Sequence, residues 1–184
     1  MKRRIIATLA ALCLFLSLAP VQSAEAASDV CFIARNDSLM ELSSAAYFRG
    51  STLYVPYSVF EYFQIYKSYY SKTSTATLYT ASKQIYFDLE SGNSYDNNGV
   101  YYSSSAIFLG SQVYVSVDFV CMQFGLTWSY IPGTGSGDIC RIKNGGAILS
   151  DDQFLSAASS LMAERYDAYT SGSTTAGTTG PSGS

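Results

Sequence analysis

The sequence contains no histidine, and charged residues make up only 14% of its 184 residues. The absence of histidine excludes a Ser-His-Asp triad, a Cys-His nucleophile pair and imidazole ligands for a metal ion. Basic residues are also few, since 11 Lys and Arg face 14 Asp and Glu, which gives a net charge of −3. A nucleic-acid-binding surface needs an excess of positive charge, so nucleic acid is not an expected partner. No catalytic motif occurs, and we predict neither an enzyme nor a cofactor.

Residues 1–26 have the pattern of a signal peptide. A basic start at residues 2–4 (KRR) precedes an apolar run at residues 5–18 that is too short to span a bilayer. Residues 24–26 (AEA) then fit the small-x-small cleavage rule, and cleavage is expected after Ala26. No later apolar stretch reaches the length of a membrane span. We therefore expect a secreted protein, and no transmembrane segment once the signal is removed.

Residues 170–184 contain only Ser, Thr, Gly, Ala and Pro. A segment of this composition has no apolar surface to bury and cannot offset the entropy of its own chain. We expect a flexible linker or tail there. The stretch between the two ends, residues 28–169, is long enough for one domain with its own core.

An internal repeat organises this domain. Residues 43–55 (SSAAYFRGSTLYV) and 103–115 (SSSAIFLGSQVYV) share eight identities in thirteen positions at an offset of 60. Such a match at a fixed period indicates two copies of one structural unit. We place the first repeat at about residues 30–80 and the second at about 83–143.

Each repeat is predicted to be a β-β-β-α-β unit, so the fold class is α+β with antiparallel sheets and short helices. Pro56 suits a helix start, and Gly50 suits a turn that needs a positive φ. The predicted elements are strands at 30–34, 39–42, 52–55, 76–80, 83–89, 112–117, 126–130 and 138–142, helices at 58–66 and 118–124, and a hairpin turn at 96–99 (DNNG).

An amphipathic helix is expected at residues 151–169, after the second repeat. Ser150 is its predicted N-cap, and Gln153 completes the capping-box pattern. The apolar stripe of this helix should pack against the rest of the domain. The stripe consists of Phe154, Ala158, Leu161, Met162, Tyr166 and Tyr169.

Two segments of the chain are similar to a known family. Residues 50–60 (GSTLYVPYSVF) and 110–128 (GSQVYVSVDFVCMQFGLTW) resemble the repeated module of the copper amine oxidase N-terminal-like domain family. The resemblance covers about residues 30–143. It departs from the family pattern at Ser116, which stands where the family has proline, and at Tyr57-Ser58 and Val117-Asp118, where the family usually has an arginine.

This resemblance implies a stalk-type module of secreted bacterial cell-envelope proteins, separate from the catalytic core that holds copper in the oxidases. The expected function is a non-catalytic structural stalk or interaction domain, with cell-wall polysaccharide or another envelope protein as partner. The alternative is the N-terminal accessory domain of a cell-wall or polysaccharide-modifying hydrolase, of deacetylase or amidase type, whose catalytic domain lies outside this chain. The linker at residues 170–184 fits that alternative by analogy.

Three cysteines follow the signal peptide, and an exported protein is permitted disulfides. Cys121 falls on the second predicted helix, and Cys140 falls on the strand expected beside it. A Cys121–Cys140 disulfide is therefore our leading expectation, and it would stabilise the fold by roughly 3 kcal/mol. Pairing through Cys31 and three buried thiols are the alternatives. A thiol nucleophile is not expected without an imidazole to activate it.

Carboxylates and turns offer only weak site candidates. Asp88 and Glu90 share one face of a predicted strand, but a glycosidase pair must face each other across a cleft, and a solvated strand face is the favoured explanation for them. Asp151 and Asp152 begin a helix, where negative charge is favourable in any case. Residues 96–99 lack the ligand spacing of a calcium loop, so no metal site is predicted.

Tyrosine is the abundant aromatic residue, with 16 copies. Tyr54 and Tyr114 belong to the repeat and are scaffold positions, and Trp128 is expected in the core. Other tyrosines could present flat surfaces to sugar rings or peptides at a low entropy cost, although half of them should face the core. The candidate binding surface consists of Tyr66, Tyr69, Tyr70, Tyr101 and Tyr102.

Overall fold

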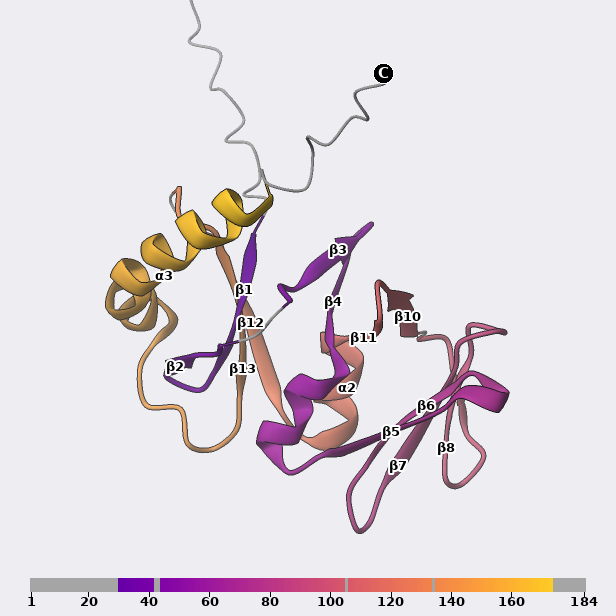
Figure 1. Cartoon of the computed structure of the whole chain (residues 1–184). Coiled ribbons are helices and arrows are strands. Elements are labelled where there is room, and N and C mark those ends of the chain that lie inside the picture. Colours follow the sequence, from indigo (N-terminus) through magenta and orange to yellow (C-terminus); the bar gives the residue numbers. More distant parts are fainter. Residues whose placement is uncertain (1–29, 42–43, 105, 134, 174–184) are drawn as a thin grey trace, which may run out of the picture.

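The computed structural model describes residues 30–173, apart from 42–43, 105 and 134. The predicted signal peptide and residues 174–184 lie outside the described residues. The described chain is an α+β fold with three sheets, largely of antiparallel strands, and short helices (Figure 1). This confirms the predicted α+β class, while the organisation into two repeated units stays a prediction.

The central sheet is built from the two segments that share the sequence repeat. Hairpin β3–β4 comes from the first copy and hairpin β10–β11 from the second, and the strand order is β10-β11-β4-β3. In the pairing of β4 with β11, Val55 lies opposite Val115, which is its equivalent in the repeat. The strands are β3 (Tyr47–Arg49), β4 (Thr52–Pro56), β10 (Ala106–Leu109) and β11 (Gln112–Ser116).

A short helix follows each hairpin. After β4 this helix is η2 (Tyr57–Phe63), of the tighter 3-10 type, and after β11 it is α2 (Val117–Phe124). The hydroxyl of Ser116 caps α2 by accepting a hydrogen bond from the backbone N–H of Phe119. Each helix ends at a residue in the left-handed conformation, Gln64 after η2 and Gly125 after α2.

Two further sheets flank the central one. One of them is covered by the C-terminal helix α3 (Asp151–Ser173) and is called the helix-covered sheet; its strand order is β12-β13-β1-β2. The other, the five-stranded sheet, has the order β5-β6-β7-β8-β9. The first comprises β12 (Thr127–Ile131), β13 (Asp138–Lys143), β1 (Cys31–Arg35) and β2 (Ser38–Leu39). The second comprises β5 (Tyr66–Tyr70), β6 (Thr75–Tyr79), β7 (Gln84–Asp88), β8 (Ser94–Asp96) and β9 (Tyr101–Tyr102), with the 3-10 turn η3 (Ser71–Thr73) between β5 and β6.

The prediction of antiparallel sheets is wrong for one pair. Strand β1 pairs with β13 in parallel, with Ile33 opposite Cys140. These two strands stand at opposite ends of the domain sequence, so no hairpin turn fixes their relative direction. Antiparallel neighbours follow from short turns, and a parallel pair needs a long connection, which here is most of the domain.

Two apolar clusters hold the fold together. The larger one lies between the three sheets and includes Val55, Val115, Ile85 and Phe60, all 0% exposed. The half-buried Trp128 packs against it, and its indole N–H donates to Asp118 at 3.1 Å. The smaller cluster lies between the helix-covered sheet and α3 (Asp151–Ser173), with members Val30, Phe32, Ala34, Ile131, Ile139, Phe154, Ala158 and Met162.

Helix α3 begins as predicted and ends later. The side chain of Gln153 accepts from the N–H of Ser150 at 3.0 Å, and the hydroxyl of Ser150 accepts from the N–H of Gln153 at 3.2 Å, which is the predicted capping box. The helix extends to Ser173, so it enters the segment expected to be a linker. Of its predicted stripe, Leu161 is 39% exposed.

Candidate binding surface

The five-stranded sheet has two different faces, and strand register decides which residues share each one. Ser68, Thr77, Tyr86, Tyr95 and Tyr101 lie opposite one another in successive strands from β5 to β9. Because side chains alternate along a strand, residues two positions away point to the same face as these. On that face, Tyr66, Tyr79 and Gln84 therefore form a second row, and Tyr70, Thr75 and Asp88 a third.

The opposite face of this sheet belongs to the larger core. Ala76, Leu78, Ile85 and Phe87 are all 0% exposed there, and Phe87 packs edge-on against Phe119 of α2. The alternation of buried and outward residues along β7 is what orients the sheet. The tyrosine face is consequently the solvent side, and it consists of Tyr66, Tyr70, Tyr79, Tyr86, Tyr95 and Tyr101.

Neighbouring rings on the tyrosine face contact each other across the strands. Tyr86 and Tyr95 stack with centroids 4.9 Å apart and planes 15° apart. Tyr101 tilts against Tyr95 at 5.7 Å, and Tyr66 tilts against Tyr79 at 5.8 Å. Contacts of this kind stabilise cross-strand pairs and hold the rings in place.

Three of the six outward tyrosines are mostly open to solvent, while Tyr86 and Tyr95 are half-buried. The exposed fraction is 73% for Tyr101, 57% for Tyr70 and 55% for Tyr66. An aromatic surface of this kind on one sheet face is a recognised feature of binding sites, since isolated exposed apolar residues are common but clusters are not.

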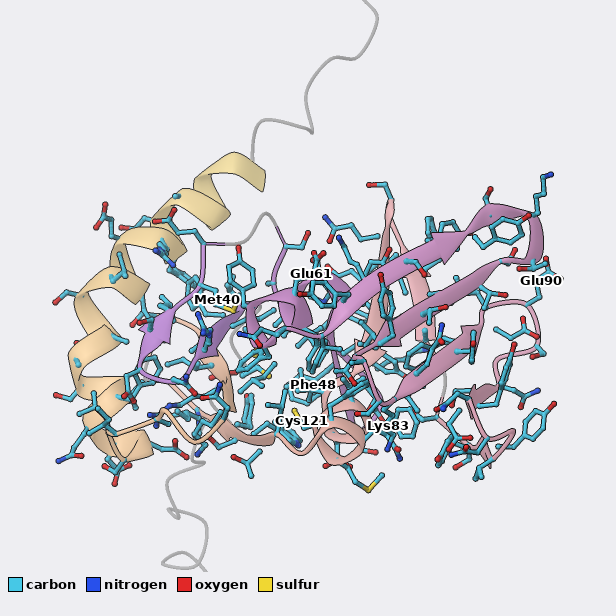
Figure 2. All side chains as sticks on the ribbon, turned by 90° about the horizontal axis from the view of Figure 1, so that it is seen from below. Met40, Phe48, Glu61, Lys83, Glu90 and Cys121 are labelled. Carbon is cyan, nitrogen blue, oxygen red and sulfur yellow. The ribbon has the colours of Figure 1, made fainter. Side chains whose placement is uncertain are left out.

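The tyrosine face is almost uncharged. Figure 2 labels Lys83 and Glu90, which flank β7 in the chain. Among the strand positions of the tyrosine face only Asp88 carries a charge, and it lies in the third row at the end of β7. Its carboxylate accepts hydrogen bonds from the Ser91 hydroxyl at 2.6 Å and from the backbone N–H groups of Ser91 and Glu90. These hydrogen bonds, that of the Ser91 hydroxyl first, lower the pKa of Asp88. The Asp88 carboxylate thus stabilises the turn that follows β7.

The structure divides the five tyrosines predicted as a binding surface. Tyr66, Tyr70 and Tyr101 lie on the tyrosine face, whereas Tyr69 and Tyr102 point to the other side of the sheet. Tyr69 is 41% exposed and contacts the ring of Phe108 at 6.0 Å. Tyr102 donates to Asp96 at 3.0 Å and packs against the core. The grouping of all five on one surface is wrong, because adjacent strand residues face opposite ways.

Three members of the tyrosine face escaped the sequence prediction: Tyr79, Tyr86 and Tyr95. The alternation of Ile85 and Phe87 with Tyr86 was a sufficient signal for Tyr86, since it predicts that this tyrosine points away from the core. Tyr79 and Tyr95 join the face only through strand register, which their local sequence does not specify.

The three cysteines are free thiols buried in the larger core, and the structure does not join Cys121 to Cys140. The expected Cys121–Cys140 disulfide is thus not formed in this structure, which has the alternative arrangement of three buried thiols. Burial raises the pKa of the Cys31 and Cys121 thiols to about 12 and raises that of Cys140 well above its usual value. At neutral pH these groups are thiols rather than thiolates, and the thiolate is the nucleophilic form.

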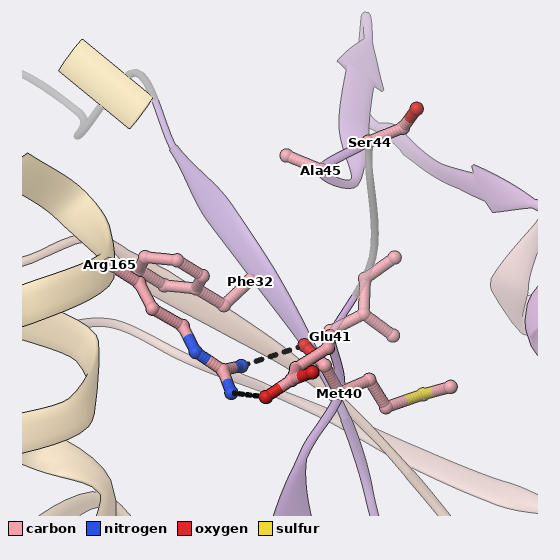
Figure 3. A pocket seen from close by; sticks show the side chains of 7 residues that line it. Phe32, Met40, Glu41, Ser44, Ala45 and Arg165 are labelled. Atoms are coloured by element: carbon pink, nitrogen blue, oxygen red, sulfur yellow. Dashed lines mark hydrogen bonds and ion pairs between the residues drawn. The ribbon is translucent and has the colours of Figure 1, made fainter. Parts of the chain in front are cut away.

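A cavity of about 330 Å³ lies between β1, α3 and the segment that leads to β3 (Figure 3). Its charged groups are Arg165 and Glu41, but the Arg165 guanidinium already donates to the carbonyl of Met40 at 2.9 Å and to the Glu41 carboxylate at 3.3 Å. The hydrogen-bond donors of this guanidinium are thus engaged by groups of the chain itself. The cavity is therefore a weaker candidate binding site than the tyrosine face.

Asp151 and Asp152 begin α3, and the carboxylate of Asp151 is engaged by basic side chains. Asp151 accepts from Arg141 at 2.6 Å and from Lys143 at 3.3 Å, and Asp152 is exposed on the same helix turn. Among the described residues, no group of three or more cysteines and carboxylates is arranged to hold a metal ion. In the same part of the chain, no helix has the length and apolarity needed to cross a membrane.

Comparisons with family models, curated proteins and solved structures give no match for this chain. The resemblance to the copper amine oxidase N-terminal-like domain therefore stays a prediction from the motifs at residues 50–60 and 110–128. The case for a function depends on the geometry of the tyrosine face.

Proposed function

We propose that the chain is a secreted, non-catalytic module of the cell envelope whose tyrosine face binds a neutral polysaccharide. One observation carries this proposal: six tyrosines from five strands share one solvent-facing sheet surface that is nearly free of charge. The sheet holds these rings on rigid elements, so little conformational entropy is lost when a ligand binds.

The chemistry of the surface suits sugar rings. Aromatic faces pack well against the C–H groups on one side of a pyranose ring, while phenol, hydroxyl and amide groups exchange hydrogen bonds with its hydroxyls. Between the tyrosines the same face presents Ser68, Thr75 and Gln84, which supply such polar groups. A neutral ligand would form hydrogen bonds with these groups. Unlike an acidic polymer, it would not have to give up the hydration of charged groups when it binds.

The size and charge of the surface favour this ligand over others. At about 200 Å² for each aromatic side chain, the exposed parts of Tyr66, Tyr70, Tyr79 and Tyr101 amount to about 450 Å². A stable protein interface buries about 800 Å² on each partner, so these rings supply too little surface for one. The net charge of −3 repels anionic polymers.

For the scaffold, we propose two copies of one unit related by a local twofold axis near Val55 and Val115, which pair directly. The aromatic contacts support this relation. Phe48 of the first copy contacts Tyr130 of the second at 5.4 Å, and Phe108 of the second contacts Tyr69 of the first at 6.0 Å. Each phenylalanine is the repeat equivalent of the other. Such a scaffold, with apolar residues inside, fits a stalk or carrier of a surface site.

A depletion assay with insoluble polysaccharides tests the binding proposal. The mature chain is mixed with cellulose, chitin and peptidoglycan, and the unbound fraction is measured. A variant with Tyr66, Tyr86 and Tyr101 each changed to Ala should bind at least about tenfold more weakly to the retained polymer. The matched control is Tyr62→Ala, since Tyr62 is 50% exposed but lies on η2. Equal binding by the triple variant and the wild type, or no retention on any polymer, would contradict the proposal.

A further inference from the structure

We infer that the ligand of the tyrosine face is a single extended glycan chain that lies across the strands rather than along them. The inference rests on the proposed function and deepens it by fixing the direction and length of the site. Its path is the tyrosine track, one ring from each strand of the sheet in order: Tyr66, Tyr79, Tyr86, Tyr95 and Tyr101.

The ring contacts of the tyrosine track run in one direction only. Tyr66 contacts Tyr79 between β5 and β6, Tyr86 contacts Tyr95 between β7 and β8, and Tyr95 contacts Tyr101 between β8 and β9. Each of these contacts crosses from one strand to the next. The ring contacts therefore form two runs across the sheet, Tyr66–Tyr79 over β5 and β6 and Tyr86–Tyr95–Tyr101 over β7 to β9.

Along the strands the aromatic surface is interrupted. Ser68 separates Tyr66 from Tyr70 on β5, and Tyr86 has Gln84 on one side and Asp88 on the other on β7. On β6 the outward residues before Tyr79 are both threonines. A glycan lying along any one strand would therefore meet a polar or charged residue next to each ring.

The tyrosine track is offset by one diagonal position at its centre, between β6 and β7. Tyr79 lies opposite Gln84, and Tyr86 lies opposite Thr77, so these two rings are diagonal neighbours across β6 and β7. Diagonal positions in an antiparallel pair are about 7–8 Å apart, which is within reach of aromatic side chains. Thr77 is only 6% exposed at this point and fills the centre of the face. The step does not break the path for a chain of rings.

The length and charge of the track define its ligand. Five neighbouring strands span about 19 Å at their usual spacing, and the contacting centroids are 4.9 to 5.8 Å apart. Each sugar unit of a linear glycan presents an apolar ring face, so successive units can contact successive tyrosines. Asp88 and Tyr70 stand in the third row, beside the track, which leaves the track itself neutral. The matching ligand is a neutral, extended glycan.

Calorimetry with cello-oligosaccharides and chito-oligosaccharides of two to six units tests the direction. Affinity should rise with length until the ligand spans about 19 Å. For the longest bound oligosaccharide, Tyr66→Ala and Tyr101→Ala, at the two ends of the track, should each weaken binding about two- to tenfold. Tyr70→Ala discriminates the track from the rest of the face, because Tyr70 is 57% exposed on the same face and the same strand as Tyr66 but lies off the track, so it should weaken binding less than either end variant. Tyr62→Ala on η2, off the tyrosine face, is the control and should leave affinity unchanged.

The outcomes separate the two proposals. Binding that weakens as much for Tyr70→Ala as for Tyr101→Ala would overturn the track and leave the tyrosine face as a polysaccharide site. The same holds if affinity does not depend on oligosaccharide length. If no oligosaccharide or polymer binds, or if sedimentation shows instead that the tyrosines join two copies of the chain, both proposals are wrong. Thermal unfolding of each variant confirms that its fold is intact.

Discussion

The helix-covered sheet and the five-stranded sheet enclose the same core but differ on their other faces. The helix-covered sheet presents Phe32, Ala34 and Ile139 to α3, and all of them are buried. The five-stranded sheet presents tyrosines with Ser, Thr and Gln, and three of those tyrosines are more than half exposed. In Figure 1, α3 lies against the first sheet and on the opposite side of the molecule from the second.

This difference supports the proposed position of the binding site. An aliphatic sheet face must be covered, and α3 covers it with Phe154, Ala158 and Met162. A tyrosine face is stable in water because each ring carries a hydroxyl, yet it keeps a large apolar area for a ligand. The end of the molecule covered by α3 is thus closed to solvent, and the end with the tyrosine face is the one proposed to bind. Substitutions at the two ends should separate these roles.

The largest effect is expected at the closed end. Phe154 is 2% exposed, and the guanidinium of Arg141 lies 4.6 Å from its ring centroid. Phe154→Ala should lower the free energy of unfolding by about 3–5 kcal/mol, because it opens a cavity and removes this contact. Leu161→Ala on the same helix, at a 39% exposed site, should cost much less. Urea unfolding measures both, and equal losses would show that α3 does not seal the sheet.

Two adjacent residues of β7 should give opposite phenotypes. Ile85 is 0% exposed in the core, and Ile85→Ala should lower stability by about 2–5 kcal/mol without removing any part of the tyrosine face. Tyr86→Ala removes one cross-strand pair and should cost about 1 kcal/mol or less, while polysaccharide binding weakens. Urea unfolding and the depletion assay together test this. A Tyr86→Ala variant that unfolds as readily as Ile85→Ala would assign the ring to the scaffold.

Acid should weaken the closed end through two carboxylates around Arg141, whose side chain is fully buried. Hydrogen bonds from the backbone N–H of Ile148, then those from Leu149 and Arg141, lower the pKa of Asp37. Burial of Asp151 opposes its ionisation, but its side-chain interactions with Ser129, Arg141 and Lys143 outweigh this effect, so its pKa is also lowered. A carboxyl group whose pKa in the folded state lies below its unfolded value of 3.8 stabilises the fold at pH values above 3.8. This stability is lost as the pH falls through the folded pKa values.

The melting temperature at low ionic strength should therefore fall as the pH is lowered from 5 to 2.5. The double variant Asp37→Asn with Asp151→Asn should melt lower than the wild type at pH 7 and depend less on pH. Asp152→Asn, at the exposed neighbouring position, is the control and should follow the wild-type curve. If the double variant keeps the full wild-type acid dependence, the carboxylates of other regions, such as Asp88 and Asp96, determine it.

The sequence allowed several local elements to be predicted because short-range chemistry specifies them. The capping box at Ser150 and Gln153 formed as expected. The turn at 96–99 did as well: Asp96 accepts from the N–H groups of Asn98 and Val100 at 2.9 Å, and Gly99 takes a positive φ. The alternation around Ile85 gave the faces of β7. Each of these signals lies within a few residues.

The candidate site could be predicted only in part, because it depends on pairing between strands. Tyr66 and Tyr70 share a face with Tyr101 through four successive registers, and none of these is set by the residues themselves. The parallel pairing of β1 with β13 was missed for the same reason. The two-unit scaffold remains a proposal, although the sequence repeat suggested it.

The smallest predicted change in the free energy of unfolding tests whether the two proposed units are equivalent. It concerns the turn that leads from each short helix into a flanking sheet. Gln64, before β5, and Gly125, before β12, both end a helix in the left-handed conformation, with φ of 61° and 71°. A side chain is disfavoured there, so Gln64→Gly should raise the free energy of unfolding by about 0.5–1 kcal/mol and Gly125→Ala should lower it by about 1 kcal/mol. Chemical unfolding of both variants measures this. Opposite signs are expected if the two turns are equivalent and only their residues differ. A loss of stability in Gln64→Gly would mean that the Gln64 side chain stabilises the path into the five-stranded sheet, and that the two ends differ at this turn as well.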